Sequence, residues 1–88
     1  MARSIQFTAT CFEEYINWRI LDDDIVDRIN KLLIDISRDP FKGIGKPEPL
    51  KGKYAGYWSR RITQEHRLIY KIEAENIKVL KCYGHYDD

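Results

Sequence analysis

YWSRRITQEHRLIYKIEAENIKVLKCY, residues 57–83, contains the pattern that decides the fold. Apolar and polar side chains alternate in three segments, as they do in half-buried strands: Tyr57–Thr63, Arg67–Glu73 and Ile77–Tyr83. The connections between these segments, residues 63–66 and 74–76, are short. Because strands joined by short turns pair in opposite directions, the stretch predicts a three-stranded antiparallel meander.

The part of the chain before this meander predicts one short strand and two helices. Residues 4–8 (SIQFT) alternate as a strand does, and Thr10 followed by Glu13 has the spacing of a helix capping box. Residues 22–24 (DDD) open a second helix, where negative charge suits the N-terminal dipole, and residues 39–40 (DP) end it. Apolar residues fall at helical spacing in both helices: Phe12, Tyr15, Ile16 and Ile20 in the first, and Ile25, Ile29, Leu32, Leu33 and Ile36 in the second.

Together these elements predict an α+β fold with the order β-α-α-β-β-β. The two N-terminal helices are expected to form an antiparallel hairpin on one face of a mostly antiparallel sheet, and the opposite face is expected to be exposed. Eighty-eight residues suit one domain, so residues 1–88 are predicted to form a single unit. A chain this short leaves no room for a deep cavity, which favours an open groove as the site.

Composition narrows the classes of function. No segment approaches the roughly 20 apolar residues of a membrane span and no signal peptide is recognised, so a cytoplasmic location is expected. Cys11 and Cys82 are expected to be reduced there, and with the two histidines they form no zinc pattern. Ten of the 15 basic residues, but only six of the 14 acidic ones, lie in residues 42–88. This basic half could bind a phosphate backbone, although charge alone favours a solvated lysine-rich surface.

Residues 41–56 are predicted to form a long loop, in which Glu48 lies between two prolines. Pro47 is expected to hold Lys46 in an extended conformation, and Pro49 is expected to do the same to Glu48. A carboxylate with so little backbone freedom fits a preorganised catalytic base. A solvated residue in a loop is the simpler interpretation.

Strand alternation sorts the basic residues by face. Arg60 and Arg61 point to opposite faces, so at most one of them serves a given site. Tyr83 and Tyr86 could stack on a nucleobase or donate to a phosphate. One face is expected to be open and cationic, with Glu48 at its rim: Arg61, Arg67, Lys71, Lys81 and His85, with Tyr83 on the same side unless Gly84 allows a bulge.

RNA cleavage without a metal needs a base for the 2′-hydroxyl, a cation for the phosphorane and an acid for the 5′-oxygen. Glu48, the pair Arg61 and Arg67, and His85 supply these residue types. Each also has a structural alternative, because arginines often form salt bridges and a histidine near a C-terminus is often simply exposed. Residue types alone therefore indicate a small α+β domain, with RNA binding as an open alternative.

Longer motifs then point to a family. The stretches DPFKGIGKPEPLKG (residues 39–52) and GYWSRRITQEHRLIY (56–70) closely resemble the YoeB (Txe) toxins of bacterial toxin–antitoxin pairs, which belong to the RelE superfamily. The ending CYGHY (82–86), EEYINW (13–18) and the helix IVDRINKLLIDI (25–36) are similar as well. The resemblance covers nearly the whole chain, and its motifs are long and in the same order.

What this resemblance implies is an endoribonuclease that cuts messenger RNA in the ribosomal A site by acid–base chemistry, without a metal or another cofactor. By position, Glu48 matches the general base, Arg67 the arginine that stabilises the phosphorane, and His85 the general acid. Tyr86 matches the adjacent catalytic tyrosine. The further substrate-binding candidates are Lys51, Arg61, Lys46 and Tyr83.

The resemblance also implies partners. A YefM-like antitoxin neutralises such toxins by covering or distorting the site, and the pair binds operator DNA only as the toxin–antitoxin complex. Toxins of this kind can also form homodimers. Two features depart from the family: Asp87 and Asp88 extend beyond the His-Tyr pair, and Gly84 directly precedes His85.

Two other classes of function remain as alternatives. A ParE-like relative would inhibit gyrase without catalysis, but the Glu–Arg–His set argues against it. A nucleic-acid-binding module without a reaction would rest on the basic half of the chain, and its affinity would fall steeply with salt.

Overall fold

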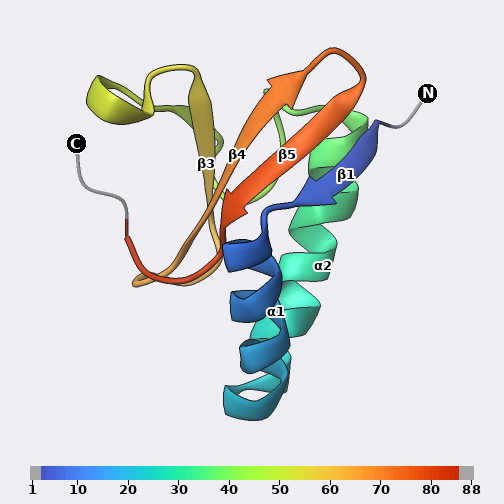
Figure 1. Cartoon of the computed structure of the whole chain (residues 1–88), viewed down its shortest axis with the longest axis vertical. Coiled ribbons are helices and arrows are strands. Elements are labelled where there is room, and N and C mark those ends of the chain that lie inside the picture. The colour runs from blue at the N-terminus through green and yellow to red at the C-terminus, as the bar shows by residue number, and fades with distance from the viewer. Residues whose placement is uncertain (1–2, 86–88) are drawn as a thin grey trace.

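Five strands form one sheet in the computed structural model, which describes residues 3–85 (Figure 1). The strands are β1 (Ser4–Phe7), β2 (Glu48–Pro49), β3 (Tyr57–Arg61), β4 (Arg67–Glu73) and β5 (Asn76–Lys81). Their order across the sheet is β1-β5-β4-β3-β2, in which β1 pairs parallel with β5 and all other neighbours pair antiparallel. The predicted α+β class and the antiparallel meander are therefore confirmed.

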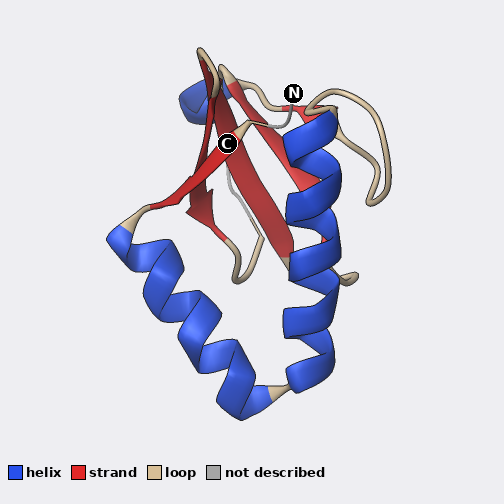
Figure 2. Ribbon diagram, turned by 90° about the vertical axis from the view of Figure 1, so that its right-hand side faces the viewer, coloured by secondary structure: helices blue, strands red, loops and turns tan. Residues whose placement is uncertain are grey.

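Two helices, α1 (Ala9–Leu21) and α2 (Asp23–Arg38), pack against this sheet and diverge from a shared turn (Figure 2). The side chain of Asp22 caps α2 by accepting from the Asp24 N–H at 3.1 Å, as the acidic run predicts. The predicted cap of the first helix is wrong, because Thr8 rather than Thr10 accepts from the Cys11 N–H. Neither helix is long and apolar enough to cross a membrane.

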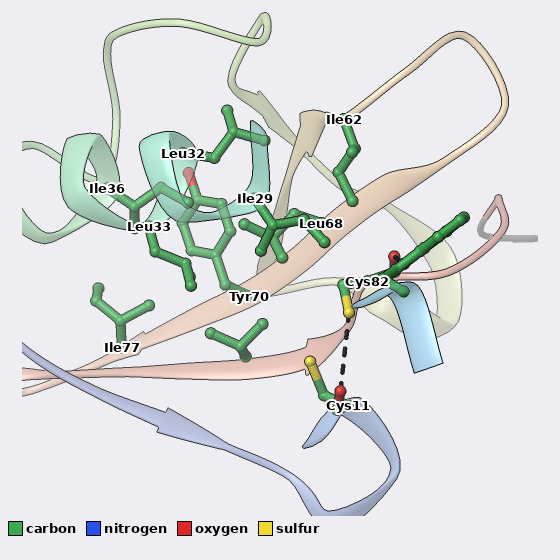
Figure 3. Close-up of a cluster of buried hydrophobic side chains, with 12 residues drawn as sticks. Cys11, Ile29, Leu32, Leu33, Ile36, Ile62, Leu68, Tyr70, Ile77 and Cys82 are labelled. Atoms are coloured by element: carbon green, nitrogen blue, oxygen red, sulfur yellow. Dashed lines mark hydrogen bonds between the residues drawn. The ribbon is translucent and has the colours of Figure 1, made fainter. Parts of the chain in front are cut away.

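The core lies mainly between α2 and strands β4 and β5 (Figure 3). The predicted apolar stripe of α2 is buried, apart from the half-buried Ile25. In α1, by contrast, Phe12, Ile16 and Ile20 form an exposed stripe, and the helix buries only Cys11 and Trp18. Helical spacing of apolar residues therefore marks a face of α1 that the chain leaves uncovered.

A β-bulge at Leu80 changes the side-chain alternation near the end of β5. Tyr70 pairs with Val79, but Ile69 pairs with Lys81, so Leu80 is an extra residue on β5. In a regular strand, Lys81 would share the core face with Val79, which lies two residues before it. The bulge instead turns Lys81 to the opposite face and returns Cys82 to the core.

The face of the sheet that points away from the helices is covered at its centre, which contradicts the expectation of an open face. Ile69 is fully buried there, and Ser59 is 3% exposed. The predicted loop 41–56 is in fact partly ordered, because it contains β2 and a 3-10 turn, η1 (Gly52–Tyr54). Tyr54 of η1 lines a hollow of about 290 Å³ that Leu80 and Lys81 also line, so this segment folds back toward β5.

Arg60 is fully buried and ties the end of α2 to the sheet. Its guanidinium donates to the Asp35 carboxylate at 2.6 Å and to the Tyr70 hydroxyl at 3.1 Å. The guanidinium also donates to three backbone carbonyls in the segment that follows α2, those of Asp39 (2.8 Å), Lys42 (3.2 Å) and Ile44 (2.9 Å). Burial raises the pKa of Tyr70, and its hydroxyl donates onward to the Pro40 carbonyl at 2.6 Å. Arg60 is thus a structural residue, on the opposite face from the exposed Arg61.

The ion pair predicts a dependence of stability on acid. The Arg60 hydrogen bond holds the pKa of Asp35 below its ordinary value of 3.8, so folding favours the charged carboxylate. This contribution to the free energy of unfolding is fully present above the unfolded-state pKa and is lost as the pH falls through the lower folded-state pKa. We expect the stability difference between the wild type and Asp35→Asn to be constant at neutral pH and to shrink below about pH 4. Urea unfolding at neutral and acidic pH measures it, and a difference that does not change with pH would contradict the prediction.

Candidate active site

Glu48 lies in β2, where it pairs with Ser59 of β3. Its extended backbone agrees with the effect expected of Pro49. The prediction for Lys46 is wrong, because its φ is 52°, in the left-handed region. The chain must turn sharply there, since the Gly45 carbonyl accepts from the Arg61 N–H at 2.6 Å and strand pairing resumes at Glu48.

The side chain of Glu48 is exposed and has no hydrogen bond or ion pair within residues 3–85. Cross-strand partners point to the same face, so Glu48, Ser59 and Ile69 form one row that ends at Lys81. Strands lie about 4.8 Å apart, which puts the backbone of Glu48 about 10 Å from that of Ile69 and about 14 Å from that of Lys81. The carboxylate therefore borders a broad surface rather than a closed pocket.

Arg67 begins β4 on the same face, opposite Arg61 of β3. One terminal nitrogen, Nη1, donates to three carbonyls of the preceding turn, those of Thr63 (2.8 Å), Gln64 (3.0 Å) and His66 (3.2 Å). The other guanidinium nitrogens have no hydrogen bond within the described residues. Arg67 is thus fixed by one arm and can present the rest of its planar fork to an anion.

His85 is brought to Arg67 by the segment that follows β5. The Arg67 N–H donates to the Gly84 carbonyl at 3.0 Å, which places the residue after Gly84 beside the start of β4. Lys81 Nζ donates to the His85 carbonyl at 3.2 Å, and the His85 side chain is exposed. The backbone of His85 therefore lies close to Arg67 and to the Lys81 ammonium at one end of the sheet.

The remaining predicted site residues divide into two groups. Arg61, Lys46 and Lys51 are exposed, and their side chains have no partner within residues 3–85. Alternation predicts Tyr83 on the same face as Lys81, but the Tyr83 ring instead packs on the side of α1. Its ring centroid lies 5.2 Å from that of Trp18. Tyr86, like Asp87 and Asp88, lies outside the described residues.

The predicted residues that the structure gathers form one cationic surface with one carboxylate at its border. Lys71 belongs to the next row of this face, where its ammonium lies 5.6 Å from the centre of the Tyr57 ring. The surface holds Glu48, Arg61, Arg67, Lys81 and His85. A carboxylate for proton removal, cations for a phosphate and an imidazole for proton delivery are the groups that phosphodiester cleavage needs.

Residues that hold the end of the chain in place were missed by the sequence analysis. Trp18 Nε1 donates to the Cys82 carbonyl at 2.9 Å, and the Glu14 carboxylate accepts from the Cys82 N–H at 2.7 Å. His66 Nδ1 accepts from the Gly84 N–H at 2.8 Å. These contacts join positions up to 68 residues apart, so no local pattern could indicate them.

Cys11, Cys82 and Glu14 also converge, with ligand atoms within 4.8 Å of one another. Both thiols are free and fully buried (Figure 3). Hydrogen bonding to Cys11 and burial raise the pKa of the Cys82 thiol, and Cys82 Sγ lies 3.7 Å from the Cys11 carbonyl as a donor. Since the Glu14 carboxylate already accepts from the Cys82 N–H, the cluster is accounted for by packing and hydrogen bonds.

An apolar hollow of about 430 Å³ lies beside this cluster. Its lining combines α1 with the end of the chain: Glu14, Asn17, Ile20, Leu21 and Tyr83. Ile20 is 81% exposed and Leu21 64% exposed, so the hollow continues the exposed apolar surface of α1. Surfaces of this kind mark protein contacts more often than catalytic sites.

The chain is similar to known proteins over nearly its whole length. Residues 7–86 match the family described as the YoeB-like toxin of bacterial type II toxin-antitoxin systems. A relative from Streptomyces coelicolor, Toxin YoeB, is 50% identical over 82 residues, covering 93% of this chain and 98% of that protein. The YoeB dimer from Staphylococcus aureus has a TM-score of 0.89 at 42% identity, covering 98% of this chain and 100% of that one. The heterotetrameric YoeB-YefM toxin-antitoxin complex from the same organism gives a TM-score of 0.87 at 42% identity, with the same coverage.

Proposed function

Because the chain belongs to the YoeB-like toxins of bacterial type II toxin–antitoxin systems, we propose that it stops translation by cutting messenger RNA in the ribosomal A site. One observation supports this activity most directly. Glu48 and Arg67 lie on one face of the sheet, the backbone of His85 lies beside the start of β4, and neither the Glu48 carboxylate nor Nε and Nη2 of Arg67 has a hydrogen bond within residues 3–85. A purely structural role would leave such groups paired or dispersed.

The reaction we propose is a transesterification at one phosphodiester bond. Glu48 takes the proton of the 2′-hydroxyl, whose oxygen attacks the phosphorus. Arg67 and Arg61 bind the phosphorane oxygens, and His85 gives its proton to the departing 5′-oxygen. The products are a 2′,3′-cyclic phosphate and a 5′-hydroxyl, so protons and charge balance without a metal or another cofactor.

The remaining site residues are proposed to bind the substrate. Lys46 and Lys51 flank Glu48 in the sequence and are exposed, so they can contact phosphates on the message. Tyr86 is proposed to act beside His85 in catalysis. The Tyr83 ring lies against α1 rather than over the sheet. We propose that it stacks on a nucleobase that extends past the edge of the sheet toward α1.

Dependence on the ribosome follows from the shape of the site. Glu48 lies about two strand spacings, or about 10 Å, from the backbone of β4, so the proposed base and the proposed cation are well separated on the sheet. A flexible RNA on such a surface rarely adopts the in-line geometry. A ribosome that holds the message in that geometry can supply about 7–11 kcal/mol of the barrier.

We also propose that a YefM-like antitoxin neutralises the chain in the bacterial cytoplasm. The solved relatives from Staphylococcus aureus include a YoeB-YefM complex and a YoeB dimer. The exposed apolar stripe of α1, Phe12, Ile16 and Ile20, provides surface for either contact. Residues 1–88 are proposed to act as one toxin domain, which contacts operator DNA only within the toxin–antitoxin complex.

A primer-extension experiment tests the activity. We expect the purified chain to produce new 5′ ends within codons of a message on translating ribosomes, and to cut the same message far more slowly without ribosomes. The triple variant with Glu48→Ala, Arg67→Ala and His85→Ala is the negative control, and we expect it to produce no new 5′ ends. An intact message with folded wild-type protein would contradict the proposal, and inhibition of gyrase in the same preparation would favour the ParE-like alternative. Salt-sensitive RNA binding without any cut would favour a binding module.

A further inference from the structure

The segment before His85 is fixed at Gly84 by two consecutive residues, His66 at the end of the turn and Arg67 at the start of β4. The Gly84 N–H donates to His66 Nδ1 at 2.8 Å, and the Gly84 carbonyl accepts from the Arg67 N–H at 3.0 Å. We propose that His66 is a positioning residue, which orients His85 for proton donation by accepting the Gly84 N–H. This inference rests on the proposed role of His85 as the acid.

Gly84 needs the attachment to His66, because the Arg67 N–H holds only the carbonyl side of this residue. Its φ is 80°, a conformation that glycine adopts easily, and within residues 3–85 no atom beyond its chain neighbours lies within 4 Å of the place where a Cβ would be. Glycine also has more backbone freedom than any other residue. Without the bond to His66, the direction in which the chain leaves Gly84 would be weakly determined, and His85 would move with it.

His66 is itself held rigidly enough to serve as a fixed point. Its ring lies edge-on to Trp18, with 4.7 Å between centroids, and 4.9 Å from the ring of Tyr83. Its backbone N–H donates to Thr63 Oγ1 at 3.1 Å, and its carbonyl accepts from the Ile62 N–H at 3.0 Å. The ring therefore has its orientation set by α1 and by the turn, before it meets Gly84.

The chemistry of the contact specifies the form of the imidazole. A backbone N–H can only donate, so Nδ1 must carry a lone pair and the proton of the neutral ring must be on Nε2. A side chain that places an acceptor at the same distance from the backbone can replace it. Asparagine does this with Oδ1, whereas glutamine places its oxygen one carbon farther out, nearer to the position of Nε2.

Positioning matters because proton donation requires hydrogen-bond distance to the 5′-oxygen. A misplacement of about 1 Å can cost about 10²-fold in rate. The contacts at Cys82 lie three residues before His85 and cannot set its direction across the flexible Gly84. The contacts nearer to His85 are those of the Arg67 N–H with the Gly84 carbonyl and of Lys81 Nζ with the His85 carbonyl. His66 holds the Tyr83–Gly84 peptide and Arg67 holds the next one, Gly84–His85, so the two bonds together set the direction of the chain at Gly84.

Three variants separate the acceptor from the ring. His66→Phe keeps a ring against Trp18 and Tyr83 but has no acceptor, His66→Asn keeps an acceptor at the δ position, and His66→Gln moves it. In single-turnover cleavage on ribosomes, we expect His66→Phe and His66→Gln to be about 10–10²-fold slower than wild type, and His66→Asn to recover most of the rate. Binding to the ribosome is expected to be unchanged in all three, so the loss falls on the chemical step.

Amide hydrogen exchange of Gly84, followed by NMR, reads the contact without any activity. We expect protection in the wild type and His66→Asn, and faster exchange in His66→Phe and His66→Gln. Unchanged Gly84 exchange in His66→Phe would overturn the inference, as would a wild-type cleavage rate in that variant. If His66→Phe does not fold, His66→Asn and His66→Gln are compared instead, and equal Gly84 exchange or equal cleavage rates in these two variants would overturn the inference.

A second background separates this inference from the proposed function. If His85 is the acid, His85→Ala slows cleavage, and adding His66→Phe slows it no further, because the positioned group is absent. An additional loss in that background would overturn the positioning role. Full activity of His85→Ala alone would instead refute the proposed role of His85, while Gly84 exchange would still report whether His66 holds the segment.

Discussion

Replacing Glu48 with glutamine is expected to slow cleavage of ribosome-bound message by about 10²–10⁴-fold, the usual contribution of a general base. Glutamine keeps the size and the hydrogen-bonding oxygen of the side chain but cannot take up the 2′-hydroxyl proton. Within residues 3–85 the carboxylate has no hydrogen bond or ion pair, so the substitution breaks no native contact. The free energy of unfolding should therefore change by less than about 0.5 kcal/mol. Single-turnover cleavage and urea unfolding measure the two effects.

Glu73→Gln is the matched control for this prediction. Glu73 is also exposed and follows the alternation of β4 onto the same face, but it lies at the opposite end of the strand, paired with Asn76. The Glu73→Gln substitution removes the same charge from the same face but far from the proposed site, so we expect a cleavage rate near that of the wild type. Equal slowing by both variants would indicate a general charge effect rather than proton transfer. A wild-type rate for Glu48→Gln would exclude Glu48 as the base.

The elements with local signals were predictable from the sequence. The meander follows from alternation and short turns, and α2 follows from an acidic start, a regular apolar stripe and a terminating Asp-Pro. The short strand at Glu48 was missed, because two residues carry no periodicity and the proline beside Glu48 argues against a strand. Its pairing with β3 depends on the tertiary fold.

The candidate site shows the same division. Residue types and motifs could nominate Glu48, Arg67 and His85, but not the contacts that bring them together. The bulge at Leu80 decides which face Lys81 occupies, and the alternation rule fails beyond it for Tyr83. Lys46 adopts a left-handed conformation that its own residue type and the following proline both disfavour. In each case, a contact between distant segments outweighs a local preference.

Replacing Arg60 with leucine is expected to lower the free energy of unfolding by about 3–5 kcal/mol, the cost of removing one partner of a buried ion pair. Within the described residues, no buried side-chain nitrogen or oxygen lacks a partner. Leucine would leave the Asp35 carboxylate, the Tyr70 hydroxyl and three backbone carbonyls without the donor they share. The segment also packs closely on this ion pair, because a Cβ on Gly43 would collide with the Asp35 carboxylate.

Arg61→Leu is the matched control, since it removes the same side chain from the neighbouring position on the exposed face. We expect it to change the free energy of unfolding by less than about 0.5 kcal/mol in urea titrations. Arg60→Lys should lie between the two, because one ammonium keeps the charge but cannot reach all five acceptors of the planar fork. Arg60→Lys also provides a measurement if Arg60→Leu does not fold.

Adding Asp35→Asn to either Arg60 variant should lower the free energy of unfolding by less than it does in the wild type, because the two groups share one interaction. Additive losses would mean that the carbonyl contacts, rather than the ion pair, account for the stability that Arg60 provides.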